Sequence, residues 1–457
     1  MNTDPKLPFL DEARSAERMV ELFNERILPP LYPGQRLARL KNQRTFYTPG
    51  ERCLMLYSLW PHDENASDEV AGPALPPFAL LSFKANGDVE QDYREHYTAS
   101  DAPVKFLDDL GVLVEFFPMD WKLPGLRLGT DMTRMAPLLD EAAGKTPAGG
   151  SRPGTWSYTV PRYHPRVRCV FQYTNGGTPE QPTRPIIGKT YSRAKKAKKV
   201  WSVLGALHEF AAARGEWRVP EPLAYVDDAN FMLMEFVSGT AMAHVICAEQ
   251  ADPGHCATMV ETAGRIVAEM HKLPMRDLPA REVEKGRNKT RWRTERMKGF
   301  IPELAREIVD LLDEIDARAD DAPPPRETFI HGSPSPKQFL VDGERMSLLD
   351  FDGAHIGDPA LDVAVFLATM CKYRQKAADP SVLEGLDERF LEAYASVSGD
   401  RETTRRARLI QAQDLVGYAV RRIARAPFEY TQSSKKPNKP NKPILLLEES
   451  RKCLAAL

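Results

Sequence analysis

The residues best suited to chemistry lie in one stretch of the C-terminal half of this 457-residue chain. His331 and Ser333 come first, and Gln338 follows shortly after them. The stretch then reads Leu-Leu-Asp-Phe-Asp, so two carboxylates, Asp350 and Asp352, flank a phenylalanine. Carboxylate and amide oxygens are the ligands that hard cations such as Mg²⁺ prefer. These residue types therefore predict a site for a divalent metal ion.

The order and spacing of this stretch resemble the aminoglycoside phosphotransferase and choline kinase-like group, which is related to the protein kinases. That group carries His-Gly-Asp, then an Asn or Gln, a strand, an Asp-Phe-Asp element and Gly-Asp-Pro-x-x-Asp. The chain matches this pattern at His331, Gly332, Gln338, Asp350, Phe351, Asp352, Gly357, Asp358, Pro359 and Asp362. The resemblance covers about 155–430 and implies a kinase-like fold that uses ATP and Mg²⁺.

The resemblance also implies roles for the residues of this stretch. Asp350 is expected to bind Mg²⁺, and Gln338 is expected to supply an amide oxygen to a second metal position. His331 is expected in the catalytic centre. Phosphoryl transfer needs positioning and neutralisation of charge more than covalent chemistry, which suits a site of this kind.

Further upstream, the resemblance implies a nucleotide site. Lys189 ends a predicted strand and is expected to hold the α- and β-phosphates. Glu209 is expected to orient Lys189 as an ion pair, because it is the only acidic residue on the helix that follows. Arg166 lies in a turn that would cover the phosphates, and Glu235 and Val237 lie in a segment that resembles the hinge strand.

One position departs from the pattern of the group. Its catalytic aspartate falls on Ser333, and a serine hydroxyl cannot act as the carboxylate that orients and deprotonates an acceptor. Three explanations stay open. Ser333 is an engineered replacement of aspartate, or it marks a natural pseudokinase that binds nucleotide without transferring phosphate, or another carboxylate such as Asp352 serves instead.

A sequence motif occurs twice in the first half of the chain. The pattern Y-x-P-x-x-R-C-x-x-x-Y fits residues 47–57 and again residues 163–173. Each copy is followed by a polar loop and then by an apolar strand that ends in a lysine, Lys84 or Lys189. We therefore expect two related β-hairpin units, with the first outside the part that resembles the kinase-like group.

The Gly- and Pro-rich segment 144–154 predicts a domain boundary. We expect an accessory domain with a partial hairpin repeat at 1–150, a kinase-like N-lobe at 151–239 and a helical C-lobe at 240–457. A strand-rich part then precedes a helix-rich part, which indicates the α+β class. The expected architecture is bilobal and protein-kinase-like, with an additional N-terminal α/β domain.

Two basic segments invite a functional interpretation, but a solvated helix face explains each of them more simply. The first contains Lys195, Lys196, Lys198 and Lys199. The second is residues 285–298 around Trp292. The second segment lies where folds of this group usually build the acceptor pocket. It therefore favours an anionic or neutral acceptor slightly over a cationic one.

Composition excludes several classes of protein. The chain has 62 Lys and Arg and 64 Asp and Glu, so its formal net charge of −2 argues against a nucleic-acid binder. No apolar run approaches the ~20 residues that a membrane span needs, and the N-terminus does not resemble a signal peptide. The six cysteines form no C-x-x-C pair, which favours a reduced, cytoplasmic setting.

The sequence thus predicts an ATP- and Mg²⁺-dependent phosphotransferase acting on a hydroxyl of a sugar, amino sugar or amino alcohol. Its expected partner is this small-molecule acceptor, with neither nucleic acid nor membrane. Two other interpretations stay open: a pseudokinase that regulates or scaffolds, and a kinase-fold nucleotidyl transferase. The identity of the acceptor and the oligomeric state are not readable from the sequence.

Overall fold

The fold is described from a computed structural model, which divides into two compact units. The first unit contains residues 1–194 and 225–233, and the second contains residues 195–224 and 234–457. The structure describes residues 4–48, 50–62, 74–85, 88–98, 102–144, 156–176, 184–299, 301–319, 326–425 and 441–457. Apart from Gly144, the predicted linker lies outside these residues. The three-part division stays a prediction.

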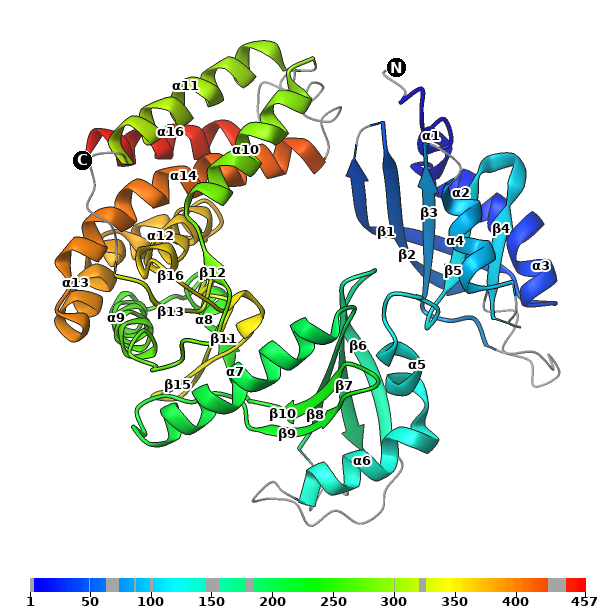
Figure 1. The fold of residues 1–457 in the computed structure, drawn as a ribbon, viewed down its shortest axis with the longest axis horizontal. Helices are drawn as coiled ribbons and strands as arrows, with labels where there is room; N and C mark the ends of the chain where they lie inside the picture. The colour runs from blue at the N-terminus through cyan, green and yellow to red at the C-terminus, as the bar shows by residue number, and fades with distance from the viewer. Residues whose placement is uncertain are drawn as a thin grey trace. The chain divides into compact units, whose positions relative to one another are not determined.

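The first unit begins with four short helical segments and an antiparallel sheet in the order β1-β2-β3-β5-β4 (Figure 1). Alternate residues of β2 face one side of the sheet, as expected from the period of a strand, and pack against the N-terminal helices. The helical segments are α1 (Leu10–Ala13), α2 (Ala16–Leu22), the π-helical turn η1 (Phe23–Ile27) and α3 (Leu28–Leu31). The strands are β1 (Leu37–Thr48), β2 (Arg52–Pro61), β3 (Phe78–Lys84), β4 (Val104–Leu107) and β5 (Val112–Phe116), with α4 (Asp88–His96) between β3 and β4 and the turn η3 (Asp108–Leu110) between β4 and β5.

A second sheet follows in the order β6-β7-β8-β10-β9. Helix α5 (Gly125–Thr130) packs closely on it because two glycines, one turn apart, face the sheet. A Cβ atom at Gly129 would lie only 2.7 Å from the ring of Phe171. The other elements are α6 (Met132–Gly144), β6 (Trp156–His164), β7 (Arg168–Asn175), β8 (Ile186–Tyr191), β9 (Pro222–Val226) and β10 (Phe231–Glu235).

The two sheets share their strand order, first-second-third-fifth-fourth, and each has a helix between its third and fourth strands. The register of the first hairpin is also the same in both. Tyr47 pairs with Cys53 in one copy, and Tyr163 pairs with Cys169 in the other. The likeness between the two regions therefore extends beyond the hairpin that carries the repeated motif.

Lys84 and Lys189, the lysines near the ends of the two apolar strands, do not occupy equivalent positions in the two sheets. The register is given by the pairs Cys53↔Phe83, Leu54↔Ser82, Cys169↔Thr190 and Val170↔Lys189. Ser82 therefore occupies the position of Lys189, and Lys84 lies two residues further along its strand. The first sheet thus lacks a lysine at the position where the second sheet has one.

The second unit is mainly helical, so a strand-rich part precedes a helix-rich part and the predicted α+β class is confirmed. Helix α7 (Ala194–Ala212) buries residues at spacings of three and four, the pattern of an amphipathic helix. Helix α12 (Ala360–Arg374) is buried over almost its whole length and forms the centre of the core. Around it lie α8 (Met242–Val245), α9 (Pro253–Met270), η5 (Pro380–Leu383) and α13 (Leu386–Ser398).

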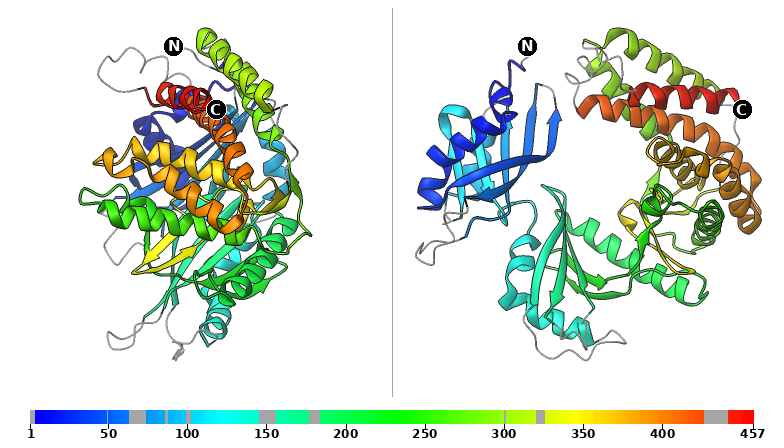
Figure 2. Two further views of the ribbon diagram at one scale, coloured as in Figure 1. Left: turned by 90° about the vertical axis from the view of Figure 1, so that its left-hand side faces the viewer. Right: turned by 180° about the vertical axis from the view of Figure 1, so that it is seen from behind.

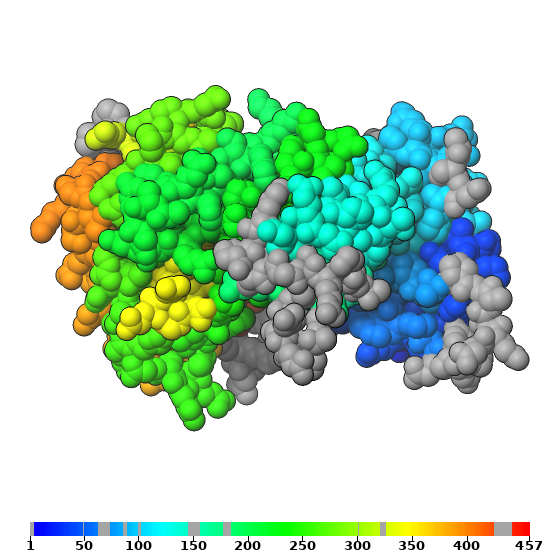
Figure 3. All heavy atoms as spheres, turned by 90° about the horizontal axis from the view of Figure 1, so that it is seen from below, coloured from blue at the N-terminus to red at the C-terminus, as the bar shows by residue number. Residues whose placement is uncertain are grey.

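Two small sheets position the loops of the site. One has the order β11-β14-β15 and the other β12-β16-β13. The exposed turn of the β14–β15 hairpin lies at the molecular surface (Figure 3). The strands are β11 (Thr240–Ala241), β12 (Ala280–Arg281), β13 (Thr328–Ile330), β14 (Phe339–Asp342), β15 (Arg345–Leu348) and β16 (His355–Gly357).

Four further helices pack side by side in the second unit (Figures 1 and 2). They share an apolar cluster that includes Ile308, Leu312, Val416 and Leu447. The helices are α10 (Glu284–Met297), α11 (Pro302–Ala319), α14 (Arg401–Arg425) and α16 (Lys442–Ala455). Within the described part of the chain, no helix has the length and apolar character to span a membrane.

Candidate active site

The loop between β13 and β14 carries His331, Ser333 and Gln338, and a buried carboxylate holds its first residues. Asp362, on α12, accepts hydrogen bonds from the main-chain N–H groups of His331 at 2.6 Å and Gly332 at 2.7 Å. It also contacts His271 Nε2 at 3.2 Å. Although burial raises it, the pKa of Asp362 is held below its ordinary value by His271 and these N–H donors. Asp362 therefore fixes the start of the loop as an ionised acceptor.

His331 links this loop to the loop that carries the two aspartates. Its Nε2 donates to the carbonyl oxygen of Leu349 at 3.0 Å, directly before Asp350. Its side chain is fully buried, and its Nδ1 has no hydrogen-bond partner. Burial lowers the pKa of His331, so the ring is neutral near pH 7. The buried ring thus positions the loop through its bond to Leu349, and a catalytic role for His331 stays a prediction.

The main chain of the loop that carries Ser333 also packs against the main chain of the loop that carries Asp350 and Asp352. Gly332 has φ +83°, and a Cβ atom there would lie 2.1 Å from the carbonyl oxygen of Gly353. Asp350 adopts φ 68°, a left-handed conformation that is unusual for a residue other than glycine. Backbone strain of this kind is found at functional sites when the surrounding structure maintains it. The contact at Gly332 and the bond at Leu349 provide that support.

The oxygen-bearing side chains form the remainder of this candidate site. Ser333 is half-buried directly after Gly332, and Asp350 and Asp352 are also half-buried. The amide oxygen of Gln338 accepts hydrogen bonds from the main-chain N–H of Ser335, at 3.2 Å, and from its hydroxyl. Gln338 would have to turn away from Ser335 before it could bind a metal ion.

The residues present fit Mg²⁺ by their chemistry. Asp350 and Asp352 lie on one short loop, and Mg²⁺ is usually held by one or two carboxylates together with phosphate oxygens and water. Among the residues that the structure describes, no three His, Cys, Asp or Glu side chains form a metal-binding group. Mg²⁺ held by these two carboxylates would complete its coordination with phosphate oxygens and water.

Two lysines of α7 contact the loop that carries Asp350 and Asp352. The sequence analysis did not predict this contact. Lys196 Nζ donates to the carbonyl oxygen of Asp352, and Lys199 Nζ donates to that of Ala354 at 2.5 Å. Burial, with a smaller contribution from Lys196, lowers the pKa of Lys199 to about 8. Lys195 and Lys198 are exposed, as expected for a solvated helix face, whereas Lys196 and Lys199 are half-buried. The i, i+3 spacing of Lys196 and Lys199 places them on one face of the helix, and this was the signal in the sequence that could have indicated a shared contact.

The predicted nucleotide residues are distributed over both units. In the first unit, Lys189 is 8% exposed, and its Nζ lies 5.4 Å from the centre of the Tyr191 ring. In the second unit, Glu209 is exposed on α7. The carboxylate of Glu235 pairs with Arg218 at 2.9 Å, and Val237 is half-buried. The predicted pairing of Lys189 with Glu209 stays a prediction.

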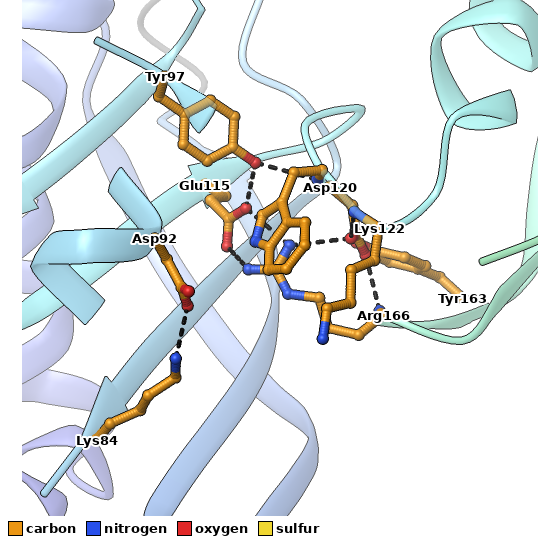
Figure 4. Close-up of polar contacts among 9 residues, drawn as sticks. Lys84, Asp92, Tyr97, Glu115, Asp120, Lys122, Tyr163 and Arg166 are labelled. Carbon is orange, nitrogen blue, oxygen red and sulfur yellow. Dashed lines mark hydrogen bonds and ion pairs between the residues drawn. The ribbon is translucent and has the colours of Figure 1, made fainter. Parts of the chain in front are cut away.

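Arg166 has a different role from the predicted phosphate contact. Its guanidinium forms ion pairs with Glu115 and, at 2.9 Å, with Asp120, and both carboxylates have fully buried side chains (Figure 4). Its main-chain N–H and the Tyr163 hydroxyl each donate to Asp120 at 2.8 Å. Although burial lowers the pKa of Arg166, the two carboxylates raise it above its ordinary value. Arg166 therefore fixes the β6–β7 turn to the segment around β5, so its guanidinium is not free for phosphate.

Comparison with known proteins gives one family match. The model of a family described as "Phosphotransferase enzyme family" matches residues 178–407. A comparison with curated proteins gives no significant match.

Several solved structures are similar at low sequence identity. A choline kinase from Cryptosporidium parvum is 12% identical with a TM-score of 0.46, and the match covers 69% of this chain and 94% of that one. A choline/ethanolamine kinase family protein from Mesorhizobium loti is 14% identical with a TM-score of 0.41, covering 70% and 94%. A macrolide 2′-phosphotransferase from Brachybacterium faecium is 17% identical with a TM-score of 0.39, covering 63% and 94%.

Proposed function

This chain belongs to the phosphotransferase enzyme family, and we propose that it binds Mg-ATP and serves phosphoryl transfer to a hydroxyl of a small molecule. The observation that carries the proposal is the pair of loops joined by Asp362, His331 and Gly332. This arrangement joins the main chain of the loop that carries Ser333 to the main chain of the loop that carries Asp350 and Asp352. Phosphoryl transfer depends mostly on such positioning.

Each residue of the site has a proposed task. Asp350 and Asp352 hold Mg²⁺, which when bound neutralises charge on the phosphate oxygens. Lys189 holds the phosphates as a point charge, and the main chain around Glu235 and Val237 holds the adenine. The Glu235 carboxylate pairs with Arg218, and its main-chain N–H donates to the carbonyl oxygen of Glu221 at 2.9 Å, so only the carbonyl oxygen of Glu235 is assigned to nucleotide.

Ser333 also supports a second candidate function. A hydroxyl does not supply the carboxylate that accepts the proton of the attacking alcohol. A chain that keeps the nucleotide site but lacks this base is a nucleotide-binding pseudokinase. The two candidates share Mg-ATP binding and differ only in turnover.

ADP release separates the two candidates. We expect Ser333→Asp to raise the rate of acceptor-dependent ADP release by about 10²–10⁴-fold, the usual contribution of a general base. The control is Ser202→Asp, which adds the same charge at an exposed position of α7. A panel of neutral, amino and acidic sugars and amino alcohols supplies the acceptor. If Mg-ATP binds but Ser333→Asp releases no ADP with any of them, the pseudokinase is the better account.

A further inference from the structure

Three half-buried cations of the second unit surround one aromatic ring and one carboxylate beside the loop that carries Ser333. They are Arg281 at the end of β12, Lys372 on α12 and Arg421 on α14, and we call them the cation cluster. Lys372 Nζ lies 3.5 Å from the centre of the Tyr418 ring, and Arg421 Cζ lies 4.6 Å from the same point. The two cations thus both lie against one tyrosine ring.

Arg281 connects the cluster to the candidate active site. Its Nη1 donates to the carbonyl oxygen of Gly332 at 2.7 Å, and Gly332 directly precedes Ser333. Arg281, Lys372 and Arg421 all lie close enough to Asp414 to influence its ionisation. A ligand bound by the cluster would therefore lie near the position at which the family carries its catalytic group.

The cluster has more positive charge than its carboxylate can balance. Three cations accompany Asp414, so the local charge is about +2 even when Asp414 is ionised. The Oδ2 atom of Asp414 is buried and accepts no hydrogen bond. Burial raises the pKa of Asp414 to about 6, although Arg421, Arg281 and Lys372 lower it. The cations are thus not arranged around Asp414 as a closed set of ion pairs.

Further cations surround the cluster. Burial lowers the pKa of Lys372 to about 8, and Arg421, Lys337 and Lys376 lower it too, against the effect of Asp414. Burial, Arg293 and Arg421 likewise lower the pKa of Lys289. Positive groups held together at this density repel one another, and an anion placed among them removes part of that repulsion.

Two acidic residues of helix α11 pair with other cations. Helix α11 contributes Asp313 and Asp316, which pair with Arg287 and Arg291 on α10 at 2.5–2.6 Å. These pairs neutralise part of the basic segment predicted from the sequence. They leave the cation cluster, on β12, α12 and α14, with its excess charge.

We infer that the cation cluster binds an oxyanion carried by the acceptor, so that the acceptor is an alcohol bearing a phosphate or a carboxylate. This inference rests on the proposed function for the phosphoryl transfer itself, while the anion site stands on its own geometry. Arg281 and Arg421 bind the oxyanion with paired N–H donors, as guanidinium groups do, and Lys372 adds a point charge. A cationic acceptor would be repelled.

Binding of inorganic phosphate tests the site without knowledge of the acceptor. The full chain is first saturated with a Mg²⁺-bound, non-hydrolysable ATP analogue, which fills the proposed nucleotide site, and phosphate is then titrated by calorimetry. We expect Arg421→Gln and Lys372→Met each to weaken phosphate binding at least tenfold. Arg422→Gln, an exposed neighbour on the same helix, should change it less than twofold. Thermal unfolding of each variant shows whether it is folded.

A second comparison identifies the acceptor class. Glucose, glucosamine, glucuronate and glucose 6-phosphate share one ring and differ in charge. We expect the two anionic sugars to bind at least tenfold more tightly than glucosamine, with the difference lost in Arg421→Gln. Phosphate binding that is unchanged in both folded cluster variants, or tighter binding of glucosamine, would overturn the inference. If the ATP analogue does not bind but phosphate binding depends on Arg421, the anion site holds and the proposed phosphotransferase function fails.

Discussion

Asp362 accepts hydrogen bonds from two consecutive main-chain N–H groups while its own side chain is fully buried. Such a carboxylate stabilises the fold because the groups around it need an acceptor, and removing an acceptor from buried donors costs more than an average hydrogen bond contributes. Its effect on activity is expected to act through Ser333, which directly follows the two bonded residues in the chain.

We expect Asp362→Asn to lower the free energy of unfolding by about 2–4 kcal/mol, because the variant loses a buried charge-assisted acceptor. Urea unfolding at pH 7 measures this loss, with the exposed Asp277→Asn as the control. The pKa of Asp362 is lowered in the fold, so its stabilisation is present above the ordinary aspartate pKa of about 4 and disappears as the pH falls through the folded value. The difference between variant and wild type should therefore shrink in acid, and a difference independent of pH would contradict this role.

The contacts of several side chains could not be predicted from the sequence. The spacing around Asp350 predicts a metal-binding loop because such motifs are local in the chain, and this role stays a prediction. His331 belongs to the same motif, but only the structure shows that its ring is buried and bonded to Leu349. Lys199 and Ala354 are 155 residues apart, and no periodicity predicts that their atoms meet.

Among the elements, the β6–β7 turn has a conformation that depends on residues distant in the chain. Arg166 adopts φ 64° at this turn, and Asp120 binds both its N–H and its guanidinium. Burial raises the pKa of Glu115 to about 7, although Arg166 lowers it. The turn is thus held by a buried network that includes residues of the N-terminal region.

Replacing Arg166 by methionine should lower the free energy of unfolding by about 3–5 kcal/mol, because Glu115 and Asp120 would be left buried without their partner. Arg162→Met, an exposed arginine of the preceding strand, is the control. Guanidinium unfolding of both variants measures the effect. Combining Arg166→Met with Glu115→Gln should restore part of the loss, and a strictly additive double variant would contradict direct pairing.

The elements themselves were predicted better than their arrangement. The two hairpins were predicted correctly from the repeated motif, because the alternation of apolar and polar residues that is typical of a strand can be recognised in the sequence. The shared order of all five strands was not predicted, since it depends on pairing between strands that are distant in the chain. For the same reason, the equivalence of Lys189 with Ser82, and not with Lys84, appeared only with the register.

At the level of the whole molecule, the described part of the chain contains two five-stranded sheets of one topology, and the loops that carry Ser333, Asp350 and Asp352 belong to the second unit. Lys84 pairs with Asp92 on helix α4 at 2.9 Å. Lys189 lies on β8 of the second sheet, within the residues 178–407 that the family model matches. The account therefore assigns one nucleotide site to the chain, on the second sheet.

Calorimetric titration of the full chain with Mg-ATP tests this central claim most directly. The account predicts one ATP per chain, an affinity lowered at least tenfold by Lys189→Ala through loss of a charged phosphate contact, and an unchanged affinity in Lys84→Ala. It is contradicted if Mg-ATP does not bind, or if the folded Lys189→Ala variant binds it as tightly as the wild type.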